Sequence, residues 1–139
     1  MGSDQQPFEF HATFDDLEEG LGILHGSVDS LRDAMGRRFG DRPLMLFETA
    51  LAEIGSNVLT HGRPPGTKRP IEFHLRCERG TVVAMLSDSG PPAHAHLSNE
   101  MPSHSSEAGR GIAMARRLLD ELGYEREGDV NRWRLVKKL

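Results

Sequence analysis

Apolar residues recur along this chain at two different spacings, and the order of these spacings is the feature that most constrains the fold. Every second residue is apolar over residues 8–14, which is the period of a half-buried strand. The same period returns over residues 71–77, and a turn at Arg79 and Gly80 then leads into a β-rich run at 81–86. These segments predict an opening strand and, later in the chain, a β-hairpin.

The intervening segments carry apolar residues three and four positions apart, as amphipathic helices do. We expect one helix over residues 15–39, a second from the N-cap Asp41 to about residue 62, and a third over residues 109–122 that Gly123 ends. A last hairpin closes the chain. The order strand, helix, helix, hairpin, long connection, helix, hairpin predicts an α+β two-layer sandwich, with helices on one face of a mixed β-sheet.

Size and charge limit the classes of protein to consider. With 139 residues, 37% of them apolar, the chain can bury one modest core, so we expect a single domain over residues 1–139, with residues 1–7 disordered or derived from a tag. A net charge of −4 with only short basic clusters disfavours nucleic acid as a direct partner. No apolar run approaches the roughly 20 residues of a membrane helix and no signal pattern opens the chain, so we expect a cytoplasmic protein. The single cysteine, Cys77, is expected to be a packed thiol.

The second predicted helix carries the first candidate site residues. Glu53, Asn57 and His61 are four residues apart, which places a carboxylate, an amide and an imidazole on one helix face. From spacing alone, such a face is more often simply solvated. For His61, a packing role and a functional role stay equally open.

A second group of candidates flanks the long connection. Asp88 ends a buried strand and Gly90 lets the backbone approach a ligand, although an Asp-initiated turn explains this pair equally well. Gly109 and Gly111 open the third helix, where N–H groups and the helix dipole favour phosphate. Neither a Walker A loop nor a dinucleotide fingerprint is present. Arg110, between the two glycines, is the candidate cation for a phosphate contact.

The connection over residues 91–108 has no usable periodicity, and its length is typical of a functional or mobile loop, so we interpret it as a candidate lid. It contains His94, His96 and His104. Because no cysteine or suitably spaced carboxylate accompanies them, we expect solvated loop histidines rather than a structural metal site.

Taken together, Glu53-x-x-x-Asn57, Asp88-x-Gly90 and Gly109-x-Gly111 resemble, in this order, the N, G1 and G2 boxes of the Bergerat-fold (GHKL) ATPases. More narrowly, the chain resembles the anti-sigma-factor serine/threonine-protein kinases. That resemblance rests on the stand-alone size, the Glu-x-x-x-Asn-x-x-x-His-Gly run, the Asp-x-Gly-Pro-Pro segment and the C-terminal Asn131-Arg-Trp-Arg-Leu-Val segment. It covers roughly residues 8–139.

The resemblance implies ATP and Mg²⁺ as cofactors and gives three side chains a role. Glu53 would be the catalytic general base that accepts a proton from the attacking serine hydroxyl. Asn57 would supply an oxygen ligand to the magnesium ion that accompanies ATP. Asp88 would accept a hydrogen bond from the adenine amino group.

The remaining candidates would contact the nucleotide elsewhere. Gly90 would let the base lie close, and Gly109 and Gly111 would present N–H groups to the phosphates. The family pattern does not reliably place an arginine at this position, and the phosphate contact of Arg110 is expected because it is the only Lys or Arg between Arg79 and Arg116. Residues 91–108 would form the ATP lid.

The resemblance also implies partners: a STAS-domain anti-anti-sigma protein as substrate, a sigma factor to sequester, and a second copy in a homodimer. One alternative is a nucleotide-binding sequestering module without phosphotransfer, which the presence of Glu53 disfavours. Another is a detached histidine-kinase catalytic domain, which commonly has asparagine in place of Glu53 and needs a phospho-accepting histidine helix. An ATPase of the gyrase or mismatch-repair type would need further domains.

Overall fold

The computed structural model describes residues 7–36, 41–61, 70–92 and 107–139, and for His61, Glu107 and Ala108 it describes the backbone alone. The elements follow the predicted order: β1 (Phe8–Phe14), α1 (Leu17–Met35), α2 (Asp41–His61), β2 (Ile71–Glu78), β3 (Thr81–Asp88), α3 (Glu107–Leu118), β4 (Glu121–Glu127) and β5 (Val130–Lys138). The expectations for residues 1–6, for most of the lid and for its histidines His94, His96 and His104 lie outside the described residues.

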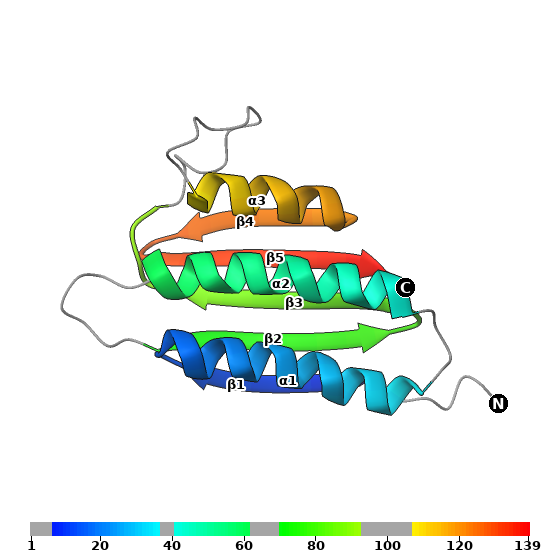
Figure 1. Cartoon of the computed structure of the whole chain (residues 1–139). Coiled ribbons are helices and arrows are strands. Elements are labelled where there is room, and N and C mark those ends of the chain that lie inside the picture. The colour runs from blue at the N-terminus through cyan, green and yellow to red at the C-terminus, as the bar shows by residue number, and fades with distance from the viewer. Residues whose placement is uncertain (1–6, 37–40, 62–69, 93–106) are drawn as a thin grey trace.

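The strands form one five-stranded sheet in the order β1-β2-β3-β5-β4. Every pairing between the described strands is antiparallel, so the expectation of a mixed sheet is corrected in this respect. Figure 1 shows the reason for the β1–β2 pair: two helices of opposite direction, α1 and α2, separate these strands, so β2 runs antiparallel to β1. A single crossover helix would have made the pair parallel.

Helices α1, α2 and α3 cover one face of the sheet, which confirms the α+β two-layer sandwich (Figure 1). Along β2, Ile71, Phe73, Leu75 and Cys77 are buried while the residues between them are more exposed, as the alternation predicts. Burial raises the pKa of the Cys77 thiol, as expected of a packed cysteine. The buried residues of β2 belong to the same core cluster as the apolar stripe of α2, whose buried residues are Leu44, Phe47, Ala50, Leu51, Ile54, Val58 and Leu59. Each large apolar side chain buried in this layer stabilises the fold by about 1.5–3 kcal/mol.

The ends of two helices differ from the expectation. Helix α1 begins after the N-cap Asp16, whose carboxylate accepts a hydrogen bond from Glu19 N at 2.9 Å, and it ends before Gly36, where φ is 63°. Helix α3 begins two residues earlier than predicted and ends at Leu118. Gly123 does not end this helix but lies within β4, because Leu122 pairs with Leu135 in the β4–β5 ladder. None of the described helices is long and apolar enough to cross a membrane.

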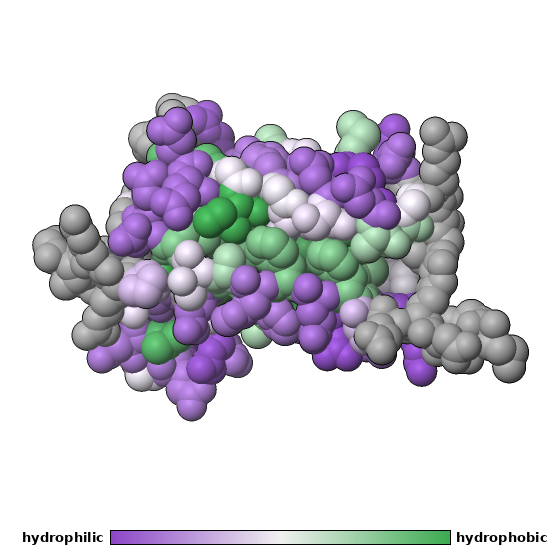
Figure 2. Space-filling model, turned by 90° about the horizontal axis from the view of Figure 1, so that it is seen from below, coloured by the Kyte–Doolittle hydropathy of each residue, from purple (hydrophilic) through white to green (hydrophobic). Residues whose placement is uncertain are grey.

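The edge of the molecule formed by β1 and α1 shows an apolar band between rows of polar residues (Figure 2). The partly buried apolar side chains of these two elements are Phe8, Phe10, Leu21, Ile23 and Met35. Strand β1 is an edge strand, so β2 is its one neighbour within the described sheet. This edge is therefore both apolar and open to further strand pairing.

Candidate functional site

The candidate site residues lie at one end of the sandwich, where four chain segments meet (Figure 1). These segments are the C-terminal half of α2, the C-terminal end of β3, the N-terminal end of α3 and the turn between β4 and β5. Helices α2 and α3 pack against each other in opposite directions, so the end of one meets the beginning of the other. The fold thus brings together residues that the sequence separates by more than half its length.

Glu53 and Asn57 are both half-buried and lie one turn apart on α2, as their spacing predicts. The Oδ1 atom of Asn57 is buried, and no hydrogen-bond donor reaches it from the described residues. An unsatisfied buried acceptor costs about 1–3 kcal/mol, and a bound cation or a hydrogen-bond donor would offset this cost.

A magnesium ion carried by phosphates fits this oxygen. Mg²⁺ prefers hard oxygen ligands and is usually held by one or two protein groups together with substrate phosphates and water. Within the described residues, no group of three or more His, Cys, Asp or Glu side chains could hold a metal by itself. In the arrangement that the sequence resemblance implies, Asn57 would be a protein ligand to an ion that arrives with its nucleotide.

Glu53 lies against the beginning of α3, at Gly111. A β-carbon added to Gly111 would be 2.7 Å from Oε2 of Glu53, closer than real contacts allow. Because α3 begins at Glu107, Gly111 is its fifth residue and lies in the second turn of the helix. Gly111 therefore has a second role in the structure: because it has no side chain, the Glu53 carboxylate can pack against the backbone of α3.

The first turn of α3 contains the other two candidate phosphate contacts. Gly109 is buried and the side chain of Arg110 is exposed at the start of this helix. Their position at a helix N-terminus suits a phosphate, because the dipole and the backbone N–H groups of the first turn favour negative charge there. The contacts themselves stay a prediction.

Asp88 ends β3 as a buried carboxylate, with 4% of its surface exposed. Its Oδ1 accepts hydrogen bonds from Gly90 N and from Asn131 Nδ2, both at 2.8 Å. The Asp-initiated turn that the sequence suggested is therefore present. Burial raises the pKa of Asp88, although the hydrogen bonds from Asn131 and Gly90 and the nearby charge of Arg126 act in the opposite direction. No hydrogen bond reaches Oδ2 of this carboxylate from the described part of the chain.

Asn131 has a part in the site that the sequence analysis did not assign to it. This side chain is 2% exposed, and its Nδ2 donates to Gly90 O at 3.1 Å and to Pro91 O at 3.0 Å, in addition to Asp88. Its Oδ1 accepts hydrogen bonds from Arg126 Nη1, at 2.9 Å, and from the Tyr124 hydroxyl. One sequence signal could have indicated this role: Asn131 is a polar residue two positions before Trp133 and four before Leu135, so it lies on the buried face of the last strand.

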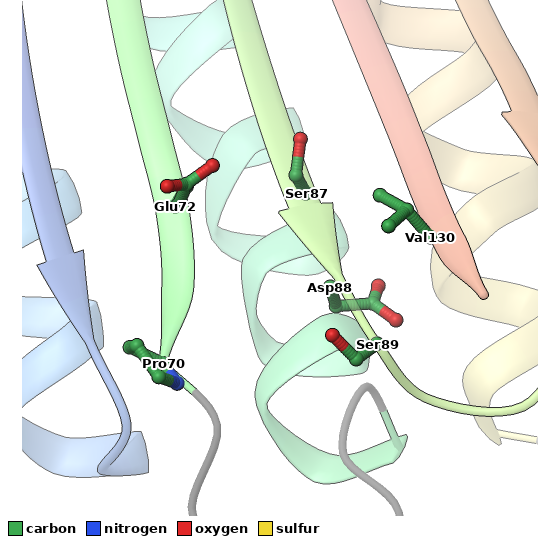
Figure 3. Close-up of a pocket in the computed structure, with 6 residues that line it drawn as sticks. All are labelled: Pro70, Glu72, Ser87, Asp88, Ser89 and Val130. Carbon is green, nitrogen blue, oxygen red and sulfur yellow. The ribbon is translucent and has the colours of Figure 1, made fainter. Parts of the chain in front are cut away.

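A cavity of about 240 Å³ borders the site on the other side of Asp88 (Figure 3). It is lined by Pro70, Glu72, Ser87, Asp88, Ser89 and Val130. Glu72 and Ser87 alternate with buried residues along their strands, so they belong to the face of the sheet that the helices do not cover. The cavity therefore shares Asp88 with the candidate site but not Glu53 or Asn57.

Residues 37–137 match the protein family described as histidine kinase-like ATPase domain. A comparison with curated proteins finds no match.

Among solved structures, the chain is similar to the histidine kinase domain of the blue-light-activated histidine kinase EL346 from Erythrobacter litoralis. That similarity has a TM-score of 0.56 and 15% identity and covers 86% of this chain and 61% of the other. The chain is also similar to the Acinetobacter baumannii histidine kinase AdeS, with a TM-score of 0.52 and 9% identity over 93% of this chain and 67% of that one. At such identities, the likeness establishes the fold alone.

Proposed function

The chain belongs to the histidine kinase-like ATPase domain family, and on that premise we propose that it binds Mg-ATP and transfers the γ-phosphoryl group to a serine or threonine of a partner protein. The partner would be a STAS-domain anti-anti-sigma protein. In the same proposal, the protein is a cytoplasmic anti-sigma factor that sequesters a sigma factor until the STAS-domain protein displaces it.

The observation that carries the proposal is the position of Glu53, which lies one turn from Asn57 on α2 and against α3 at Gly111. The buried, unsatisfied Oδ1 of Asn57 lies one turn from a carboxylate, and that carboxylate lies against the helix whose first turn favours phosphate. A magnesium ion held by Asn57 and the phosphates would neutralise the charge of the transferred group.

Each remaining side chain has a task in this proposal. Glu53 accepts the proton of the attacking hydroxyl, a role that requires a carboxylate within hydrogen-bond distance of the substrate. Asp88 accepts a hydrogen bond from the adenine amino group, and Gly90 leaves room for the base beside it. Arg110 contacts the phosphates from the first turn of α3.

The choice of serine kinase over the alternatives rests on the sequence resemblance together with Glu53. A sequestering module has no need of a carboxylate one turn from the magnesium ligand, yet Glu53 is present and lies against α3. A histidine-kinase catalytic domain commonly has asparagine at this position. The two histidine kinases with similar structures support the fold and do not decide between these activities.

The open edge of β1 and α1 supports the homodimer in this proposal. An apolar band beside an edge strand suits a second copy of the chain, because both the strand backbone and the apolar side chains would gain partners (Figure 2). Sedimentation of the wild type and of Phe10→Glu tests it: we expect a dimer that the substitution dissociates. A monomeric wild type would contradict this part of the proposal.

The activity itself is tested by titration calorimetry and radiolabelled transfer. We expect magnesium-dependent ATP binding by the wild type and its loss in Asn57→Ala and Asp88→Asn, with Thr49→Ala, an exposed position of α2, as the matched control. Transfer to a purified STAS-domain protein encoded beside this chain should stop in Glu53→Gln while ATP still binds. Binding without transfer in the wild type favours the sequestering module, and an absence of ATP binding contradicts the proposal.

A further inference from the structure

We propose that Asn131 is a positioning residue, which fixes the Asp88 carboxylate in the orientation that accepts the 6-amino group of adenine. The inference rests on the proposed ATP binding, and it adds a determinant of base specificity to it. Asn131 lies in β5 directly opposite Asp88 of β3 in the strand register.

The surroundings of the Asn131 amide determine its orientation. Its oxygen faces donors, the Tyr124 hydroxyl and Arg126 Nη1, while its nitrogen faces acceptors on Asp88, Gly90 and Pro91. A flipped amide would place donor against donor and acceptor against acceptor, and at 2% exposure water cannot compensate for this. One orientation of the side chain is therefore strongly favoured.

The same amide connects Asp88 to the turn that follows it. Its Nδ2 reaches the carboxylate and two successive backbone carbonyls, and Arg126 Nη1 also donates to Gly90 O at 2.9 Å. Asn131 and Asp88 themselves lie in neighbouring strands of the sheet, so the hydrogen bond between their side chains joins two rigid elements. The turn and the carboxylate are expected to move as one unit.

Holding Oδ1 determines which oxygen of Asp88 is offered to a ligand. Oδ1 accepts from Gly90 N and Asn131 Nδ2, whereas Oδ2 accepts nothing from the described residues. A 6-amino group can donate to Oδ2, but the carbonyl of a 6-oxopurine would oppose its lone pairs. Loss of the Asn131 amide frees the carboxylate to rotate, and the discrimination between the two bases should weaken.

If Asn131 served only to link β3 to β5, its removal would have a different consequence. The variant would then be less stable, but its folded fraction would keep the full preference for ATP over a 6-oxopurine nucleotide. The ratio of affinities for ATP and inosine triphosphate, which has a carbonyl at the 6-position, separates the two roles.

The experiment measures Mg-ATP and Mg-inosine triphosphate binding by calorimetry on the full chain, with thermal unfolding of each variant recorded alongside. We expect the wild type to prefer ATP and Asn131→Ala to lose about tenfold or more of that preference, mainly through weaker ATP binding. The neighbouring Arg132→Gln, on the other face of the sheet, should keep the ratio.

Each outcome decides a different statement. A wild type that binds no ATP overturns the proposed function. A wild type that binds ATP without preference, or a folded Asn131→Ala that keeps the preference, overturns this inference alone. If Asn131→Ala does not fold, Tyr124→Phe, which removes one donor to the amide, decides in its place: a reduced ratio supports the inference and an unchanged ratio overturns it.

Discussion

The carboxylate of Glu53 lies so close to Gly111 that a β-carbon at Gly111 would be 2.7 Å from Oε2. This contact joins the middle of α2 to the second turn of α3. It explains why residue 111 is a glycine: the Glu53 carboxylate leaves no room for a side chain there, whereas the backbone conformation does not require glycine. The proposed general base and the proposed phosphate site therefore share one contact.

Gly111→Ala tests the importance of this contact. The added methyl group displaces the Glu53 side chain, so we expect phosphoryl transfer to fall by tenfold or more. ATP affinity should change much less, because Glu53 does not hold the nucleotide in this proposal. Stability should change little, since alanine favours a helix over glycine by about 0.8–1.0 kcal/mol and offsets the displacement. Transfer rates, ATP titration and thermal unfolding measure the three effects.

Gly22→Ala is the matched control. Gly22 lies on the exposed side of α1, and an added β-carbon would have nothing within 4 Å. We expect a gain of about 0.5–1 kcal/mol in the free energy of unfolding, with transfer unchanged. If Gly111→Ala retains full transfer, the closeness of Glu53 to α3 has no catalytic role.

Asn57→Ala should separate stability from ligand binding. The substitution removes a buried oxygen that accepts no hydrogen bond from the described residues, so the free energy of unfolding without nucleotide should stay within about 1 kcal/mol of the wild-type value. Mg-ATP should raise the unfolding temperature of the wild type and leave that of the variant unchanged, because only a bound ligand shifts the equilibrium. Thermal melts with and without Mg-ATP measure this. An equal shift in both proteins would remove Asn57 from the magnesium site.

Asp88→Asn should show a pH-dependent gain in stability. The folded pKa of Asp88 is raised above its ordinary value of 3.8, mainly by burial, so the unfolded chain loses this proton first as pH rises. Below that ordinary value the carboxyl group is neutral in both states and contributes no difference. The cost of ionising it in the folded state grows between the ordinary and the raised pKa and then stays constant.

The variant carries no such proton, so its stability relative to the wild type should rise across this window and reach a plateau toward neutral pH. Urea unfolding of both proteins at several pH values between about 4 and 7 measures the difference. A difference that does not change with pH would contradict the prediction. ATP binding should be lost throughout, because the amide cannot replace the carboxylate at the adenine amino group.

The fold was predictable where one residue pattern decides one element. The bounds of β1 match the alternation over residues 8–14, and the β2–β3 hairpin lies where the alternation and the Arg79-Gly80 turn place it. The direction of the strand pairs outside the two hairpins was not predictable from the side-chain period, because this period is the same in parallel and antiparallel strands. The end of α3 was missed because Leu122 continues the helical spacing but packs as a strand residue.

The candidate site was predictable only within single elements. Glu53 and Asn57 belong to one helix, so their spacing determines that they share a face. Asn131 and Asp88 are 43 residues apart, and their hydrogen bond depends on the register between β3 and β5. Contacts of this kind follow from the assembled sheet and not from local pattern.

Gly55→Ala tests the packing that supports the site from behind. Gly55 is buried on α2 between the candidate residues Glu53 and Asn57, and a β-carbon added to it would overlap Cδ1 of Leu24 on α1. Leu24 is 1% exposed, so its side chain has little room to move. Overpacking of this kind costs about 1–3 kcal/mol, which exceeds the gain in helix propensity. Urea unfolding should therefore show a net loss of stability, in contrast to the gain expected for Gly22→Ala.

Restoring space with the double variant Leu24→Val and Gly55→Ala should recover part of the loss, because the two positions are in contact. If Gly55→Ala alone is as stable as the wild type, α1 is not packed against α2 as closely as the structure describes, and its support of the Glu53 and Asn57 turn is correspondingly weaker.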